Sequence, residues 1–214
     1  MEEPLKRKLK VKVTKVEPVT KTKYKVFLDD QFAFVLYKGE LSRYGIRDGA
    51  ELEEETRQKI WDEVIVKRAR ARAMHLLEDM DRTEAALREK LKQGLYPEAA
   101  IESAVQYVKS FHYIDDLRYA ERFIESRKSV KSRKEIYALL RGKGVAIDKI
   151  ETAFEECYQD DSEKAAIQQL IQKKRVNLSQ PNPAEIQKLY GYLSRKGFRY
   201  EDIRQVIQNH NEKA

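Results

Sequence analysis

The stretch IYALLRGKGVAIDKIETAF, residues 136–154, contains the spacing that decides the fold. Its apolar anchors, Ile136, Leu140, Ile150 and Phe154, are separated by four, ten and four positions. Residues four apart lie on one face of an α-helix, and a gap of ten that contains a glycine leaves room for a helix end, a turn and a new helix. The stretch therefore predicts a helical hairpin with one apolar face on each helix.

The same four-ten-four spacing occurs once before this hairpin and once after it. The matching anchors are Leu87, Leu91, Ile101 and Val105, and then Leu189, Leu193, Ile203 and Ile207. Gly94, Gly144 and Gly197 follow the second anchor of each set and suit the left-handed position that ends a helix. An amphipathic run precedes each hairpin, so we expect three tandem three-helix repeats, a pattern typical of arrays whose units stack on their neighbours.

The amino-terminal part has a different period. Between residues 9 and 37 the runs LKVKVTKV, YKVFL and FAFVLY are β-branched or aromatic and partly alternate, which is typical of strands. Asp29 and Asp30 separate the last two runs and suit a tight turn, so these runs predict a hairpin. The surface of these strands could bind a partner, shield a sheet edge or cap the helices, and the residues do not choose among these roles.

The expected fold class is mainly α, with three tandem three-helix repeats in an elongated, curved array and a small N-terminal β extension of three strands. The expected parts are the β-rich residues 1–52 and the repeats 53–110, 111–160 and 161–214. Local signals support these starts: Pro97 and Pro183 suit a first helical turn. Capping-box spacing occurs in the pairs Ser132 and Glu135, Asp148 and Glu151, and Asn182 and Glu185.

Asp115 and Asp116 invite two interpretations, a catalytic or metal-binding pair or the start of a helix. Consecutive helical residues point about 100° apart, which does not favour convergence on one metal ion. Asp115 as the N-cap and Asp116 in the first turn, facing the positive end of the helix, account for both carboxylates. Capping is therefore the favoured hypothesis, and a chemical role is the alternative.

Composition excludes several classes of protein. The 214 residues include 37% charged residues and carry a net charge of +7, and Cys157 is the only cysteine, so no disulfide framework can form. His75, His112 and His210 lie far apart, without metal-ligand spacing, and no nucleophile or phosphate-binding motif is present. No segment reads as a signal peptide or a membrane span. We expect a soluble cytoplasmic protein that is not an enzyme and needs neither cofactor nor metal.

Basic residues recur at similar places in the repeats. The candidate docking residues are Arg127, Lys128, Lys131, Arg133, Lys134, Arg141, Lys143, Lys173, Lys174, Arg175, Arg195 and Lys196. A stripe of this kind can bind a nucleic-acid backbone or an acidic protein groove. Ordinary solvated helix faces are the alternative interpretation.

Four segments resemble the RecX family of regulatory proteins. They are RTEAALREKLKQG at 82–94, YIDDLRYAERFIESR at 113–127, IYALLRGKGV at 136–145 and YLSRKGFRYEDI at 192–203. The resemblance covers about residues 65–210, and the strands look like an extension carried by some members. It implies tandem three-helix repeats, in agreement with the repeat found from the spacing alone.

The resemblance also implies a function. Members of the family are modulators, usually negative, of the RecA recombinase: they dock on its filament on single-stranded DNA and alter its ATPase, strand-exchange and coprotease activities in DNA repair and the SOS response. The implied partners are the RecA filament and single-stranded DNA, and a monomer is expected. A protein that binds single- or double-stranded DNA directly and competes with the recombinase is the alternative. On the leading hypothesis the basic residues supply docking charge, and a second set fixes the geometry of the middle repeat and the helix turns. This second set is Ile114, Asp115, Asp116, Tyr119, Gly144 and Gly197.

Overall fold

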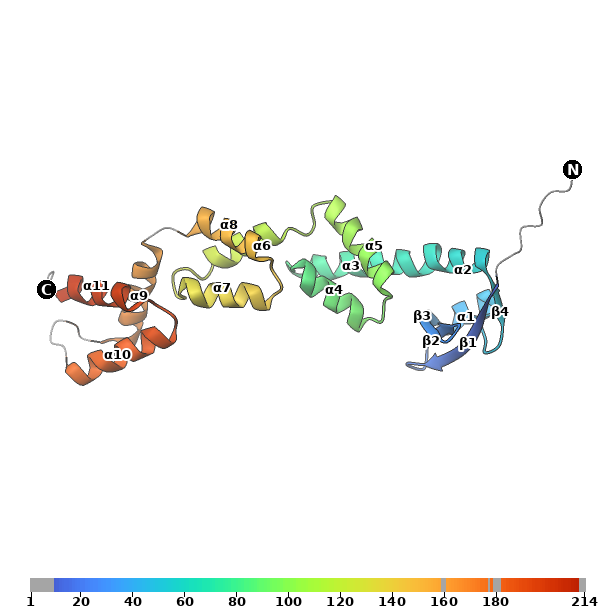
Figure 1. Cartoon of the computed structure of the whole chain (residues 1–214), viewed down its shortest axis with the longest axis horizontal. Coiled ribbons are helices and arrows are strands. Elements are labelled where there is room, and N and C mark those ends of the chain that lie inside the picture. Colours follow the sequence, from blue (N-terminus) through green and yellow to red (C-terminus); the bar gives the residue numbers. More distant parts are fainter. Residues whose placement is uncertain (1–9, 159–160, 177, 179–181, 212–214) are drawn as a thin grey trace, which may run out of the picture. The chain divides into compact units, whose positions relative to one another are not determined.

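The computed structural model describes residues 10–158, 161–176, 178 and 182–211. The elements, in chain order, are β1 (Lys10–Pro18), β2 (Lys23–Leu28), β3 (Gln31–Tyr37), α1 (Lys38–Tyr44), β4 (Glu51–Glu53), α2 (Glu54–Ile60), the π-helical segment η1 (Trp61–Val66), α3 (Lys67–Asp79), α4 (Glu84–Gln93), α5 (Glu98–Ser110), α6 (Asp116–Glu125), α7 (Arg133–Gly142), α8 (Ile147–Cys157), α9 (Ser162–Lys174), α10 (Pro183–Arg195) and α11 (Tyr200–Asn211). The predicted fold class is confirmed, because the chain is mainly helical with a small N-terminal antiparallel sheet (Figure 1).

The chain folds as two compact units. The first contains residues 1–81 and 86–114, and the second contains residues 82–85 and 115–214. The four-part division expected from the sequence stays a prediction.

The sheet of the first unit has four strands in the order β3-β2-β1-β4, all antiparallel to their neighbours. Asp29 and Asp30 form the turn between β2 and β3 with φ values of 45° and 65°. Two positive φ values in succession are the mark of the two-residue turns whose twist matches a hairpin, so the predicted hairpin is confirmed. Two short elements were not predicted: β4, which has only three residues, and the helix α1, whose C-cap is Gly45.

One apolar core joins the sheet to the helices of the first unit. Val26, Phe34 and Leu36 from the strands are buried in the same cluster as Ala69 and Ala73 from α3. Trp61, Ile65, Ala69 and Ala73, which are four apart in the sequence, share this helical face: the last three are buried, and Trp61 packs against the cluster. The six-residue π-helical segment within it was not predicted, because no residue type marks such a segment.

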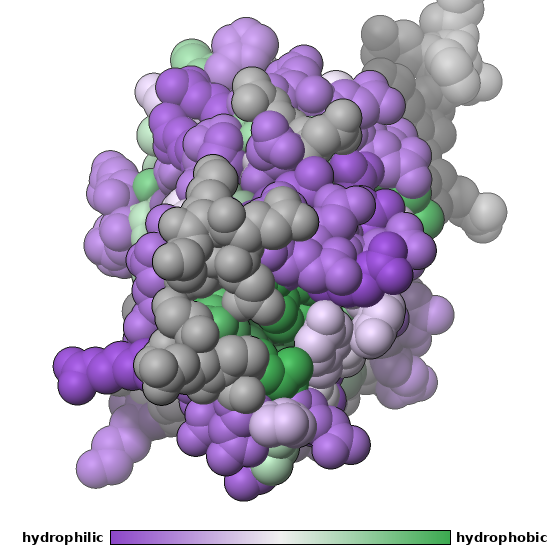
Figure 2. All heavy atoms as spheres, turned by 90° about the vertical axis from the view of Figure 1, so that its left-hand side faces the viewer, coloured by the Kyte–Doolittle hydropathy of each residue, from purple (hydrophilic) through white to green (hydrophobic). Residues whose placement is uncertain are grey.

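The second unit contains two helical trios, each with its own apolar cluster. We call α6–α8 the middle trio and α9–α11 the last trio (Figure 1). Ile136, Leu140, Ile150 and Phe154 are all fully buried in the middle trio, as their spacing predicted. Hydrophilic residues cover most of the face nearest the viewer in Figure 2, and hydrophobic residues show mainly in a hollow near its centre, with smaller patches toward the edges.

The predicted left-handed glycines are correct at two positions and wrong at the third. Gly144 has φ of 78° and Gly197 has φ of 90°, whereas in the first hairpin the left-handed residue is Leu95, with φ of 61°. Leu95 lies four positions after Leu91, just as Gly144 lies four after Leu140. The first hairpin therefore has its left-handed residue at the same distance from its second anchor as the other two hairpins. Gly94 instead leaves room for the Tyr96 ring, because a Cβ on Gly94 would lie 3.0 Å from that ring.

The helix starts follow the predicted caps in part. Ser132 caps α7 by accepting a hydrogen bond from Glu135 N at 3.1 Å, and Asn182 caps α10 by accepting one from Ala184 N, with Pro183 as the first helical residue. The prediction for Asp148 is wrong, because the N-cap of α8 is Ala146, two residues before Asp148, and the helix begins at Ile147. Asp148 instead lies in the first turn, where a carboxylate faces the positive end of the helix.

We expect Gly144→Ala to lower the stability of the protein by about 2 kcal/mol. Alanine is strained at a left-handed φ, and its Cβ would lie 2.3 Å from the Cβ of Ala85, so that the backbone would have to shift. Gly142→Ala is the matched control, because a Cβ at this helical position meets nothing within 4 Å and alanine favours helix. Urea unfolding measures both variants, and equal midpoints would contradict the prediction.

Candidate functional site

Asp115 and Asp116 both accept hydrogen bonds from backbone amides. Asp115 Oδ1 accepts from Leu117 N at 2.9 Å and from Arg118 N at 3.1 Å, which confirms it as the N-cap of α6. Asp116 is buried, and its Oδ1 accepts from Glu84 N at 2.9 Å. Within the described residues, no cluster of three or more His, Cys, Asp or Glu side chains is placed to hold a metal ion. The geometry therefore supports capping and not a chemical pair.

Two hydroxyl-to-carbonyl bonds connect parts of the second unit that are distant in sequence. Thr83 Oγ1 donates to the carbonyl of Lys143 at 2.7 Å, and Ser132 Oγ donates to the carbonyl of Lys196 at 2.6 Å. Each acceptor lies in the turn between the second and third helices of a trio. Both hydroxyls are almost fully buried, so each bond satisfies groups that water does not reach.

A buried acid accompanies each of these bonds. Asp116, the first residue of α6, accepts from Glu84 N, and Glu163, in the first turn of α9, accepts from Arg133 N at 2.9 Å. The same two bonds thus occur twice: a hydroxyl at a helix start donates to a turn carbonyl, and the backbone amide of the next residue donates to a buried carboxylate. We call each set of two bonds a joint. Thr83 and Asp116 belong to the first joint, and Ser132 and Glu163 belong to the second.

Gly144 and Gly197 allow the close approach that the joints require. A Cβ on Gly197 would lie 2.9 Å from Ser132 Oγ and 3.3 Å from the Cβ of Lys134. These glycines were predicted from their position after the second anchor, but their contacts with a helix start were not.

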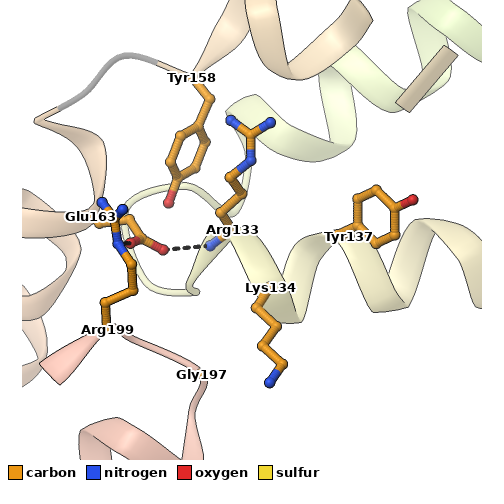
Figure 3. A pocket seen from close by; sticks show the side chains of 7 residues that line it. All are labelled: Arg133, Lys134, Tyr137, Tyr158, Glu163, Gly197 and Arg199. Atoms are coloured by element: carbon orange, nitrogen blue, oxygen red, sulfur yellow. Dashed lines mark hydrogen bonds and ion pairs between the residues drawn. The ribbon is translucent and has the colours of Figure 1, made fainter. Parts of the chain in front are cut away.

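A pocket of about 550 Å³ lies beside the second joint (Figure 3). Its lining residues are Arg133, Lys134, Tyr137, Tyr158, Glu163, Gly197 and Arg199. Arg199 Nε lies 2.8 Å from Asp202 Oδ2 and 3.8 Å from Glu163 Oε2, so one guanidinium faces two buried carboxylates. Burial raises the pKa of Glu163, and the neighbouring Asp202 raises it further, while Arg133 N and Arg199 act in the opposite direction.

The hydroxyl of Tyr158 is buried beside the same joint without a hydrogen-bond partner among the described residues. Burial raises the pKa of Tyr158, and the charge of Glu163 adds to the effect, so the phenol stays protonated. The phenol therefore adds no negative charge to the pocket.

Some predicted docking cations have carboxylate partners. Lys128 Nζ lies 2.7 Å from Glu125 Oε1 and donates to the carbonyl of Cys157, and Lys131 is paired with Glu135. The Arg133 guanidinium lies 4.5 Å from the centroid of the Phe154 ring. Lys134, Arg141 and Lys173 are exposed on their helices.

Other predicted cations gather around rings or in a pocket. Arg127 and Lys143 both lie over Phe123, and Lys174 and Lys196 both lie over Tyr192. Lys174, Arg175 and Arg195 line a second pocket of about 480 Å³ next to Tyr192. The sequence showed that these residues are basic, but it could not show which of them converge.

The remaining predicted structural residues lie on both sides of the boundary between the units. Tyr119 is half-buried and stacks on Phe123 with a centroid separation of 6.2 Å. Ile114 is buried in the apolar cluster of the first unit, and not in the middle trio.

Comparison with known proteins identifies the family. The chain is 34% identical over 187 residues to the regulatory protein RecX of Caldanaerobacter subterraneus subsp. tengcongensis, and the match covers 87% of this chain and 92% of the relative. The chain belongs to the RecX family. RecX of Clostridium botulinum is 28% identical over 92% of the chain and 95% of its own length. Residues 69–107 match the model of the first three-helix domain of RecX, and residues 161–207 match that of the third.

Solved RecX structures have the same fold. A crystal structure of regulatory protein RecX matches with a TM-score of 0.59 at 26% identity and covers 92% of this chain and 98% of its own. RecX from Lactobacillus salivarius matches with a TM-score of 0.58 at 21% identity, over 70% of this chain. None of the helices in the described part of the chain combines the length and the apolar character needed to cross a membrane.

We expect Ser132→Ala to cost about 2 kcal/mol of stability, because it removes the N-cap of α7 and leaves the carbonyl of Lys196 without its donor. Thr152→Ala is the control, since the exposed Thr152 hydroxyl donates only within its own helix, to the carbonyl of Asp148. Thermal unfolding compares the two variants. A Ser132→Ala protein as stable as the control would show that the joint contributes little.

We expect Glu163→Gln to stabilise the protein more at pH 7 than at pH 4. Because the folded-state pKa of Glu163 is raised, the native protein loses stability as the pH rises from the unfolded pKa through the folded pKa. Glutamine has no charge to bury and can still accept from Arg133 N. Urea unfolding at both pH values measures the difference, and a gain that is constant or smaller at pH 7 would contradict the raised pKa.

Proposed function

We propose that this protein is a non-enzymatic regulator that binds the filament of the RecA recombinase on single-stranded DNA. It acts as a cytoplasmic monomer and lowers the ATPase, strand-exchange and coprotease activities of the filament in DNA repair and the SOS response. Membership of the RecX family, whose curated members are named regulatory proteins, is the observation that carries this proposal.

The charge of the second unit supports this proposal. Lys134 and Arg141 are exposed on α7, and Lys173 and Arg175 are exposed at the end of α9 and just after it. Exposed cations of this kind attract a polyanionic assembly and raise its rate of association. Several weak contacts along one filament add through their high effective concentration.

Direct binding to DNA, in competition with the recombinase, is the second candidate. The observation that favours it is the set of cations around Phe123 and Tyr192, for which the described residues provide no carboxylate partner. The two functions differ in stoichiometry, because a competitor must cover the DNA whereas a filament regulator acts at few positions.

The test is the single-stranded-DNA-dependent ATP hydrolysis of the cognate RecA while this protein is added well below one copy per recombinase protomer, with DNA in excess. We expect hydrolysis to fall at these ratios. Inhibition that begins only when the protein is sufficient to coat the DNA would support the competitor instead.

Lys134→Glu with Arg141→Glu should weaken binding to the filament about tenfold, because two attractive charges become repulsive. Arg47→Glu with Lys59→Glu is the matched control, since both residues are exposed in the first unit and the change in net charge is the same. Sedimentation with filaments measures binding, and circular dichroism confirms that the helices are retained. Equal binding by the two variants would remove α7 from the docking surface.

A further inference from the structure

Two cations converge on one aromatic ring in the middle trio. The Arg127 guanidinium lies 3.9 Å from the centroid of the Phe123 ring, and Lys143 Nζ lies 5.6 Å from the same centroid. Arg127 follows α6, and Lys143 lies in the turn after α7, so the two cations come from different parts of the trio. We call Phe123, Arg127 and Lys143 the first ring site.

The last trio contains the same arrangement. Lys174 Nζ lies 4.7 Å and Lys196 Nζ 5.5 Å from the centroid of the Tyr192 ring. Lys174 ends α9, and Lys196 directly follows α10. We call Tyr192, Lys174 and Lys196 the second ring site.

The four cations occupy corresponding positions of the two trios. Lys174 lies 47 residues after Arg127, the same interval that separates the joint acids Asp116 and Glu163. Lys196 lies 53 residues after Lys143, the interval that also separates Gly144 and Gly197. Each trio therefore places one cation at the end of its first helix and one before its left-handed glycine.

The rings, in contrast, come from different helices. Phe123 lies on α6, and the corresponding residue of α9, 47 positions later, is Leu170. Tyr192 lies on α10, and the corresponding residue of α7, 53 positions earlier, is Leu139. The middle trio thus has its ring on the first helix and a leucine on the second, whereas the last trio has its leucine on the first helix and its ring on the second. Duplication of one trio would leave the ring on the same helix in both copies, so duplication alone does not explain why both trios keep the cation–ring contacts.

The cations of the ring sites are not held in ion pairs within the part of the chain that the structure describes, although Glu185 lines the pocket that also contains Lys174 and Tyr192. Among the described residues no carboxylate forms an ion pair with any of the four cations, and the polar contact of the Arg127 guanidinium is with Ser126 Oγ. Lys128 and Lys131, by contrast, each have a glutamate partner. Two positive charges beside one ring repel each other, and an anion between them would remove this cost.

We propose that each ring site binds a phosphate of one single-stranded nucleic-acid backbone. The ring holds the cations through cation–π contacts, and their N–H groups remain able to donate to phosphate oxygens. A phosphodiester chain offers regularly spaced single charges, which suits two sites that recur from trio to trio. The inference deepens the proposed function and relies on it for the identity of the nucleic acid as single-stranded DNA.

The test is the affinity of the full chain for a fluorescent oligothymidylate, without recombinase, at a series of salt concentrations. Arg127→Gln with Lys143→Gln, and separately Lys174→Gln with Lys196→Gln, should each reduce the slope of log affinity against log salt by about 0.7, since each variant removes one ring site and about 0.7 is lost per phosphate contact on a single strand. Arg47→Gln with Lys59→Gln is the control: both residues are exposed in the first unit, the same charge is removed, and the slope should stay nearly unchanged.

Moving the ring tests the geometry. Phe123 is only 7% exposed and belongs to the apolar cluster of the middle trio, so leucine is chosen to keep that position apolar. Phe123→Leu should weaken binding about threefold, because it removes cation–π contacts of roughly 0.5–1 kcal/mol. Adding Leu139→Phe restores a ring at the position that the last trio uses, and it should recover most of the lost affinity. Leu139 is 38% exposed, so the larger side chain has room. Failure of this rescue, with the helices intact by circular dichroism, would overturn the role given to the ring.

The two proposals can fail separately. A variant without all four cations that keeps the wild-type affinity and slope overturns the ring sites, even if it no longer inhibits RecA, because the cations would then contact the recombinase. A reduced slope in a protein that never inhibits RecA at low ratios supports the ring sites and contradicts the proposed function.

Discussion

The hydrogen bond from a helix-start hydroxyl to the carbonyl before a left-handed glycine is the interaction on which the arrangement of the second unit depends. Ser132 Oγ uses its lone pair to cap α7 and its proton to bind the carbonyl of Lys196. One buried hydroxyl thus caps the start of a helix and attaches that helix to the next trio. Gly197 makes this possible, because any larger residue would occupy the position of the hydroxyl. Stability and arrangement are therefore coupled at a single side chain.

Local features of this fold could be predicted from sequence, because local contacts decide them. The burial of Ile136 and Leu140 follows from helical spacing, and the cap at Asp115 follows from its place before an amphipathic run. The partner of Asp116 could not be predicted, since Glu84 N lies 32 residues away and is brought near only by packing. Leu95 was missed for another reason: leucine rarely adopts a left-handed φ, so nothing in its identity marks the position.

The candidate site illustrates the same limit. The sequence identified the basic residues but not their partners, and the partners divide them into different kinds. Lys131 lies four residues before Glu135 on the chain, so its ion pair is a local event. Lys174 and Tyr192 belong to different helices, and their contact exists only because α9 and α10 pack in one trio. A count of positive charge treats these lysines as equal, although among the described residues only Lys131 of the two has a carboxylate partner.

The start of α10 affects whether a further copy of a trio, added by duplication, could form a joint with the last trio. The residue that corresponds to Ser132, 53 positions later, is Glu185, which lies inside α10 because that helix has 13 residues where α7 has 10. Pro183, the first residue of α10, has no amide proton to offer a buried acid, and the side chain of Asn182 accepts from its own helix. A duplicated trio placed after this one could find a hydrogen-bond donor in the side-chain NH2 group of Asn182, but no backbone amide proton at Pro183 for its buried acid. A second bond of the joint would therefore require replacement of Pro183.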